Sequence, residues 1–128
     1  MKNNFSTLWR EAYAVSKERK LGRSGSYGGV GSALITRKGN IYTGTCIDVD
    51  CSLGFCAEHS AIAEMLKHGE SAIKEIIAVT NQKKILPPCG RCRELIYQVD
   101  STNKNTLVHL SENTQKKLRA LLPDHWRG

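Results

Sequence analysis

The sequence lacks several features that would assign it to whole classes of protein. It has no apolar run long enough to cross a bilayer, no apolar signal segment near Met1 and no lipidation motif. Internal repeats, linkers and the composition shifts that mark domain boundaries are also missing. We therefore expect a single domain over residues 1–128, a cytoplasmic location and no membrane partner.

Acidic residues are relatively scarce. The chain has 12 Asp and Glu against 19 Lys and Arg, which gives a formal net charge of +7. An excess of positive charge can indicate nucleic-acid binding, but it can also simply keep a surface solvated. The basic residues are dispersed along the chain. They do not form a block interleaved with stacking aromatics, which is the pattern of single-strand binding surfaces. We therefore prefer the solvated-surface interpretation and do not expect a nucleic-acid partner.

The cysteine count argues against a disulfide framework. Five cysteines are an odd number, and in a reducing compartment cysteines indicate metal ligands and spare thiols. A chain of 128 residues with 40% apolar residues can bury a core without disulfides. Cys46 and Cys51 are either small, partly buried side chains or residues that line the site of the other three cysteines, since they lie just upstream of Cys56.

The order of predicted elements indicates an α/β protein. Apolar spacing predicts helices at about 5–20, 56–68 and 89–100, and a short helix or strand–helix junction at 115–122. Strands are predicted at 30–36, 41–46, 73–80 and 105–110. The glycine-rich stretch 21–29 carries neither phosphate-binding glycine motif, so we expect a flexible loop there. The helices between strands suit right-handed crossovers, which would pair 41–46 with 76–79 and 76–79 with 107–110 in parallel.

The strongest pattern is Cys56-x-Glu58, followed by Pro88-Cys89-x-x-Cys92. Cys89 and Cys92 can face one side of a first helical turn, and Cys56 opens another predicted helix. Three protein ligands suit tetrahedral zinc and leave a fourth position for water, whose pKa zinc lowers. Glu58 is close enough to transfer protons without being a ligand. We also expect the helix N-termini to lower the pKa values of these thiols.

A purely structural zinc site is the alternative interpretation. Such a site is usually closed by four ligands, and Cys46 or Cys51 could be the fourth. However, structural sites generally combine two short ligand pairs, only one C-x-x-C is present, and Glu58 would have no role. We prefer the catalytic interpretation.

These motifs match the three-cysteine signature of the zinc nucleobase deaminases. From about Tyr27 to its end the chain resembles the cytidine deaminase superfamily, specifically the compact enzymes that act on free nucleosides. The resemblance implies a three-layer α/β/α sandwich with a mixed five-stranded sheet. It also implies that Cys56, Cys89 and Cys92 bind Zn²⁺ and that Glu58 shuttles protons. Such enzymes hydrolyse the cytosine amine of cytidine or deoxycytidine in pyrimidine salvage, and they are usually homotetramers that share residues between active sites.

The chain departs from this family where the substrate is expected to bind, a site to which we also assign Ala57. Gly28 stands where cytidine deaminases carry an aromatic residue. Cys46 and Asp48 stand where an N-x-E motif holds the ribose; Asp48 can still accept a hydroxyl hydrogen bond, but a thiol replaces an amide poorly.

Two further residues are candidates to neutralise the thiolates. His59 occupies a position where many family members have an arginine, and Arg91 lies between the paired cysteines. His59 could equally be a surface or partly buried histidine.

The loop before Cys56, the run from Pro88 to Arg93 and the tail with Trp126 resemble blasticidin-S deaminase, which acts on a cytosine nucleoside antibiotic. Trp126 either approaches the substrate, as the C-terminal aromatics of that relative do, or packs on the domain or a neighbour. Two other functions are considered: a deaminase of nucleotides or of bases in nucleic acid, and a catalytically silent zinc-stabilised binding or assembly domain. The former class more often has histidine in place of Cys56, and Glu58 argues against the latter.

Overall fold

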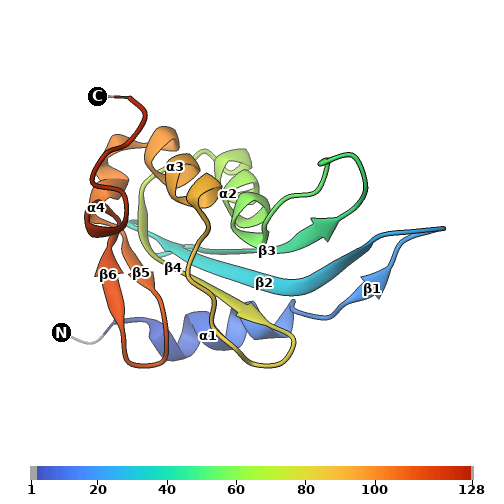
Figure 1. Cartoon of the computed structure of the whole chain (residues 1–128). Helices are drawn as coiled ribbons and strands as arrows, with labels where there is room; N and C mark the ends of the chain where they lie inside the picture. The colour runs from blue at the N-terminus through green and yellow to red at the C-terminus, as the bar shows by residue number, and fades with distance from the viewer. Residues whose placement is uncertain (1–2, 128) are drawn as a thin grey trace.

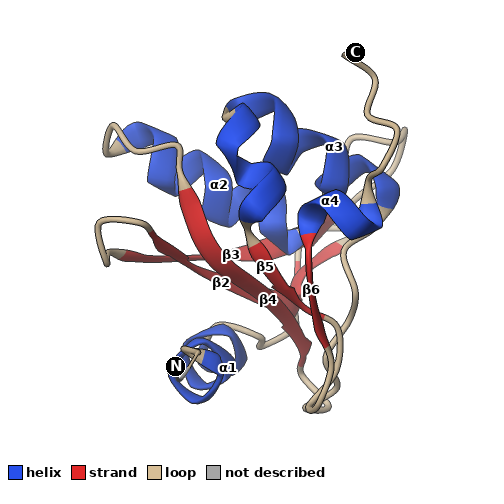
Figure 2. Cartoon of the chain, turned by 90° about the vertical axis from the view of Figure 1, so that its left-hand side faces the viewer, coloured by secondary structure: helices blue, strands red, loops and turns tan. Residues whose placement is uncertain are grey.

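The computed structural model describes residues 3–127, which form three layers with a sheet in the middle (Figures 1 and 2). Helix α1 (Phe5–Ala14) covers one face of the sheet. The other face carries α2 (Ala57–Lys67), α3 (Gly90–Val99) and α4 (Leu118–Leu121), and the 3₁₀ turn η1 (Ser101–Asn105) follows α3. The predicted α/β/α sandwich is confirmed. None of the described helices has the length and apolar character needed to cross a membrane.

Within residues 3–127 the sheet is mixed and has six strands, so the expectation of five is wrong. The strands are β1 (Arg19–Lys20), β2 (Ser26–Thr36), β3 (Ile41–Asp48), β4 (Ile73–Thr80), β5 (Leu107–His109) and β6 (Gln115–Lys117). β1 pairs only with the start of β2, and two charged, exposed residues carry no periodic pattern that could reveal a strand. β6 has three exposed residues and leads directly into α4, which confirms the strand–helix junction that was one of the two expectations for 115–122.

Strand pairing confirms one of the two predicted parallel pairs. β4 and β5 are parallel neighbours, joined through α3. β3 and β4 are not neighbours, because β2 lies between them and pairs antiparallel with both. The predicted β2–β3 hairpin is present, and its partner strand β4 joins the opposite edge of β2. As a result, α2 and α3 lie side by side over the same face (Figure 1).

The glycine-rich stretch is more regular than predicted. β2 already begins at Ser26, and a register shift between Tyr27 and Gly31 interrupts its pairing with β3. Gly28 has φ +86°, and a Cβ at this position would lie 2.2 Å from the carbonyl oxygen of Lys17. The first helix also ends earlier than predicted, at Ala14, which frees the following residues to reach Gly28 and pair as β1. Glycine is required here for close backbone approach rather than for a loose loop.

Each face of the sheet has its own apolar cluster. Beneath α2 and α3, the cluster includes Leu34, Met65 and Ile76, whereas Leu8 of α1 packs with Ile77 on the opposite face. Consecutive residues of β4 therefore serve different layers. The burial of β4 on both faces confirms the prediction for this strand. The apolar cluster beneath α2 and α3 holds these two helices against the sheet.

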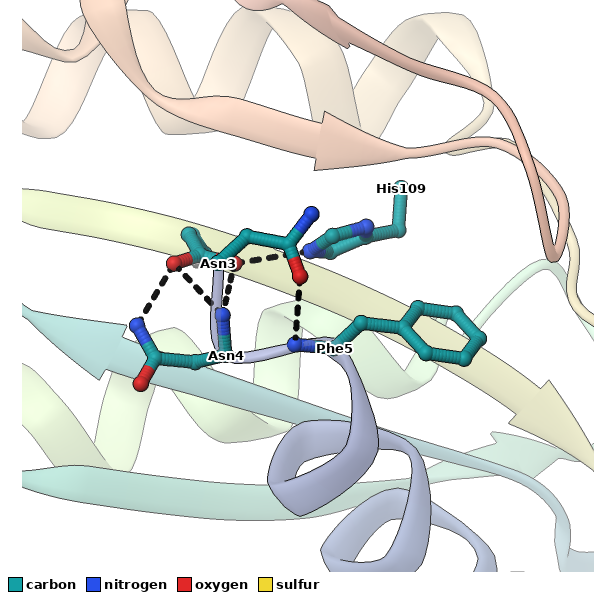
Figure 3. A network of polar contacts seen from close by, with 5 residues as sticks. Asn3, Asn4, Phe5 and His109 are labelled. Carbon is teal, nitrogen blue, oxygen red and sulfur yellow. Dashed lines mark hydrogen bonds and ion pairs between the residues drawn. The ribbon is translucent and has the colours of Figure 1, made fainter. Parts of the chain in front are cut away.

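A buried polar cluster fastens the start of α1 to the sheet (Figure 3). Glu75 of β4 is only 2% exposed, and its carboxylate accepts hydrogen bonds from the backbone N–H and the side-chain amide of Asn4. Its Oε1 also lies 2.8 Å from Nε2 of His109 on β5, and Phe5 packs edge-on against that ring. Because Asn4 precedes the first turn of α1, the carboxylate also faces the positive end of the helix dipole.

Candidate metal centre and adjoining cavity

Three cysteines meet where two helices begin. Cys56 is the N-cap of α2, Cys89 is the N-cap of α3, and Cys92 lies in the first turn of α3. Their sulfur atoms all lie within 4.8 Å of one another, with Cys89 Sγ 3.5 Å from each of the other two. Zinc–thiolate bonds of about 2.3 Å in a tetrahedron separate sulfurs by roughly 3.8 Å. The cluster thus has the spacing of a preformed zinc site.

The remaining cysteines do not complete a four-thiol site. Neither Cys46 nor Cys51 belongs to the cluster of possible metal ligands. Cys46 is buried in β3, and Cys51 is exposed in the β3–α2 loop. With three thiols, the centre leaves a fourth coordination position for a small ligand, as catalytic zinc sites do.

Burial makes two of the three thiols hard to ionise on their own. Removal from water, with a smaller effect of the neighbouring Cys89, raises the pKa of Cys56 to about 11. Burial, followed by the negative charges of Glu58 and Cys56, also raises the pKa of Cys92. At Cys89, hydrogen bonds from the Cys92 backbone and from both other thiols outweigh partial burial, so its pKa is lowered. The expectation that the helix N-termini lower all three pKa values is therefore right for Cys89 alone.

The three-thiol cluster needs a bound cation to be stable in its ionised form. Three sulfurs in close contact cannot all carry negative charge without compensation, and a bound divalent ion deprotonates coordinating thiols outright. Thiolate donors favour zinc among common divalent ions of the cell. The donor set and its spacing thus both fit Zn²⁺.

Glu58 lies beside the thiol cluster, on the wall of a cavity. It is the second residue of α2 and only 5% exposed. Burial raises the pKa of its carboxyl group, although its own backbone N–H and Cys92 act in the opposite direction. A carboxyl group held this way is suited to exchange protons with a bound molecule near neutral pH.

The cavity has a volume of about 660 Å³ and joins the cluster to the β3–α2 loop. Cys56, Glu58 and Cys89 line it, together with three residues predicted to bind substrate, namely Cys46, Asp48 and Ala57. Backbone and apolar groups of residues 29–30, 54–55 and 86–87 supply much of the remaining wall. Its volume falls within the range of about 300–1,000 Å³ that is usual for small-molecule sites.

Two predicted substrate residues lie elsewhere. Gly28 is buried against the backbone of Lys17, and its neighbours Gly25 and Gly29 contribute to the cavity wall instead. The Trp126 side chain is 77% exposed and is not among the described residues that line this cavity. Within one chain, neither residue is placed to contact a molecule in the cavity.

Cys46 and Asp48 are linked to each other. The sulfur of Cys46 accepts a hydrogen bond from the backbone N–H of Val30 and lies 3.5 Å from Oδ2 of Asp48, to which the thiol can donate. Burial raises the pKa of Cys46, so it remains a protonated thiol. Asp48 is exposed at the cavity wall and has further acceptor capacity for a ligand.

The two candidates for thiolate neutralisation have different contacts. His59 Nδ1 lies 3.5 Å from Cys92 Sγ, and its ring stacks on Phe55. Burial, followed by the nearby Arg91 charge, lowers the pKa of His59. Arg91 itself is exposed at the cavity wall and donates to the carbonyl oxygen of Gly54 at 3.4 Å. His59 therefore contacts a cluster cysteine, whereas Arg91 is hydrogen-bonded to the β3–α2 loop.

Two further residues at the site depend on long-range contacts that local sequence patterns do not reveal. Asp50 also lines the cavity, because the β3–α2 loop folds back through a bridge between Ile47 and Phe55. Arg93 bridges the loop before Cys89 and the end of α4, where its guanidinium bonds to Pro88 and Leu121. Its position in the run after Cys92 was a visible signal, but its distant partner was not.

The fold and the site together define a three-layer α/β protein with a three-thiol metal centre at paired helix N-termini. The model of the family "Cytidine and deoxycytidylate deaminase zinc-binding region" matches residues 3–108. The chain therefore belongs to this zinc-binding deaminase family.

Individual relatives agree with this assignment. The chain is 32% identical over 72 residues to a cytidine deaminase of Halalkalibacterium halodurans, covering 55% of this chain and 54% of the relative. It is 33% identical over 67 residues to a probable cytidine deaminase of Dictyostelium discoideum, covering 51% and 46%. The matched part of the chain thus spans about half the length of these curated relatives.

Solved structures resemble nearly the whole chain. The cytidine deaminase of Mycobacterium leprae superposes with a TM-score of 0.81 at 26% identity, covering 96% of this chain and all of that one. The cytidine deaminase of Mycobacterium tuberculosis gives a TM-score of 0.82 at 23% identity, with 98% of each chain covered. The second likeness shows the fold alone.

Proposed function

We propose that this chain is a zinc-dependent hydrolase that converts the cytosine amine of a free nucleoside, such as cytidine or deoxycytidine, to a carbonyl and releases ammonia. One observation carries the proposal: three thiols lie within 4.8 Å of one another beside the buried Glu58, which lines a cavity together with Cys56 and Cys89. Cys56, Cys89 and Cys92 would hold the zinc. The names of the similar proteins support the same activity.

The chain's own groups supply the proton transfers. When bound, zinc acts as a Lewis acid that lowers the pKa of water to near neutrality. Glu58 would accept a proton from the attacking water and deliver it to the ring nitrogen, which makes C4 of the base more electrophilic. The oxygen of the water would bond to C4 in this step. The Glu58 carboxylate would then take the proton of the hydroxyl group added to C4 and carry it to the amine, so that the carbonyl forms as the carbon–nitrogen bond breaks and ammonia leaves. Its burial keeps bulk water from competing for the proton.

The charge of the cavity wall favours a nucleoside over a nucleotide. Besides Glu58, the wall carries the carboxylates of Asp48 and Asp50 against the single guanidinium of Arg91, counted over the described residues. Two carboxylates repel a phosphate group, and Arg91 already donates to Gly54. The family description includes deoxycytidylate deaminases, so this point separates two substrate classes within the family.

We assign the sugar end of the substrate to Cys46 and Asp48, and the base to the wall near Ala57. Asp48 can accept a hydrogen bond from a sugar hydroxyl while it receives the weak thiol donor of Cys46. The residue at position 46 also favours a second candidate substrate, blasticidin S. A thiol stands there, so the proposed sugar site lacks the amide that binds ribose in the usual N-x-E motif. An antibiotic deaminase would then have poor activity on cytidine itself.

The assembly is proposed to be a homotetramer of single-domain chains that works in the cytoplasm in pyrimidine salvage. Trp126, together with Leu53 in the β3–α2 loop, exposes a large apolar side chain that a neighbouring subunit could cover. Light scattering on a sizing column should give a mass near four times 14.2 kDa. A monomer would refute the assembly but leave the chemistry standing.

The experiment that tests the proposed activity is an ultraviolet absorbance assay over cytidine, deoxycytidine, cytosine, blasticidin S and dCMP. We expect turnover of at least one free nucleoside or the antibiotic, with much slower turnover of dCMP. Preference for dCMP would refute the nucleoside assignment. Zinc-loaded protein that turns over none of them would favour the silent binding domain.

A further inference from the structure

Arg93 makes three hydrogen bonds, two to the residues that lead into α3 and one to the end of α4. Its backbone N–H donates to the carbonyl oxygen of Cys89, and its Nε donates to the carbonyl oxygen of Pro88 at 2.9 Å. Its Nη1 donates at 3.1 Å to the carbonyl oxygen of Leu121, the last residue of α4. The side chain is half-buried, so these bonds are shielded from competing water.

The Pro88 carbonyl belongs to the peptide unit that leads into Cys89. Pro88 is itself buried, and Cys89 is the N-cap residue whose backbone orientation aims its thiol at Cys56 and Cys92. The fork of a guanidinium can hold two carbonyl oxygens in fixed directions at once, whereas a lysine ammonium is a single point. Arg93 thus fixes the orientation of the Pro88–Cys89 peptide relative to α4.

The segment that follows α4 packs against α3, the helix that carries Cys92 and Arg93. The backbone N–H of Trp126 donates to Oε1 of Glu94 at 2.8 Å, and the ring of His125 stacks on Tyr97 with centroids 4.0 Å apart. Residues 121–126, the C-terminal segment, therefore contact α3 at three points along the helix that carries Cys92. This segment is tied to the metal-bearing helix although it does not line the cavity.

We propose that Arg93 is a positioning residue for Cys89, and that through Arg93 and Glu94 the C-terminal segment sets how tightly the thiol cluster holds its metal. The inference rests on the proposed binding of zinc by Cys56, Cys89 and Cys92. Residues that orient metal ligands typically change metal affinity by about 10- to 100-fold when they are replaced. Weakening the C-terminal segment should then release zinc from a centre that it does not touch.

The test measures zinc release from the folded, zinc-loaded protein with an excess of a chromophoric chelator. We expect Arg93→Gln to release zinc about 10- to 100-fold faster than the wild type. Arg93→Lys keeps the charge but can hold only one of the two carbonyl oxygens. Its rate of zinc release should therefore lie between those of the wild type and Arg93→Gln. Glu94→Ala, which removes the acceptor for Trp126, should accelerate release several-fold.

Leu8→Ala is the matched control, because Leu8 is a fully buried residue of α1 that packs against the opposite face of the sheet. It lowers stability without touching α3, and we expect zinc release near the wild-type rate. Equal acceleration by Leu8→Ala and Arg93→Gln would overturn the positioning role, as would unchanged rates in both Arg93 variants. An unchanged rate in Glu94→Ala would overturn the coupling to the C-terminal segment. Wild-type protein that holds no zinc would instead refute the proposed function.

Discussion

His59 Nδ1 lies 3.5 Å from the sulfur of Cys92, the most deeply buried of the three cluster cysteines. A ring N–H at this distance can donate to a thiolate and stabilise it. We expect His59→Ala to weaken zinc binding by about 10- to 100-fold in a chelator competition. His68→Ala, at the other end of the same helix, is the control and should bind zinc normally. Equal zinc affinity of the two variants would contradict a role of His59 in stabilising the metal centre.

Asp48 is expected to matter for the sugar and for rejection of phosphate. Asp48→Asn removes the charged acceptor, and hydrogen bonds to charged groups are worth about 1.5–3 kcal/mol. We therefore expect kcat/KM for the preferred nucleoside to fall about 10- to 100-fold, mainly through KM, while the relative activity on dCMP rises. Asp50→Asn, which changes the same charge elsewhere on the wall, should affect KM less. An unchanged KM in Asp48→Asn would place the sugar away from this residue.

Glu75 should stabilise the fold without taking part in chemistry. Glu75→Ala removes the acceptor shared by Asn4 and His109 in the interior, and breaking a buried pair of this kind typically costs about 3–5 kcal/mol. We expect urea unfolding to show a loss of this size, with kcat per folded molecule unchanged. Glu11→Gln on the exposed side of α1 should have little effect. Comparable stability of the two variants would contradict the anchoring role.

Asp100 makes the stability depend on pH in the acid range. Hydrogen bonds from Thr102, and then from Ser71, lower the pKa of its carboxyl group. A depressed pKa stabilises the fold above the unfolded value of about 3.9, and the contribution is lost as the pH falls through the folded value. Asp100→Asn should therefore be less stable than the wild type at pH 7, and the gap should close as the pH falls through the lowered pKa of Asp100. A constant gap in urea unfolding, or the same loss in the exposed Asp124→Asn, would contradict this.

The sequence was most informative where a residue's role depends on local spacing. The spacing of Cys56, Glu58, Cys89 and Cys92 predicts that each half of the motif opens a helix, and both helices begin there. The three cysteines come together as a result. The buried strand β4 was found for the same reason, since its apolar run is continuous.

What could not be predicted depends on contacts between distant parts of the chain. The place of β2 between β3 and β4 is set by pairing across the sheet, and the burial of Gly28 depends on the backbone of Lys17. The thiol pKa values likewise follow from burial, which a motif does not report. Arg93 directly follows the motif, but its role depends on Leu121.

The central claim is that Glu58 carries protons beside a zinc held by three cysteines. The most direct measurement is zinc content and nucleoside turnover on the same preparations of wild-type protein and Glu58→Gln. We predict about one zinc per chain in both proteins and a loss of turnover of about 10²–10⁴-fold in the variant. Native wild-type protein without zinc, or a variant as active as the wild type, would contradict the account.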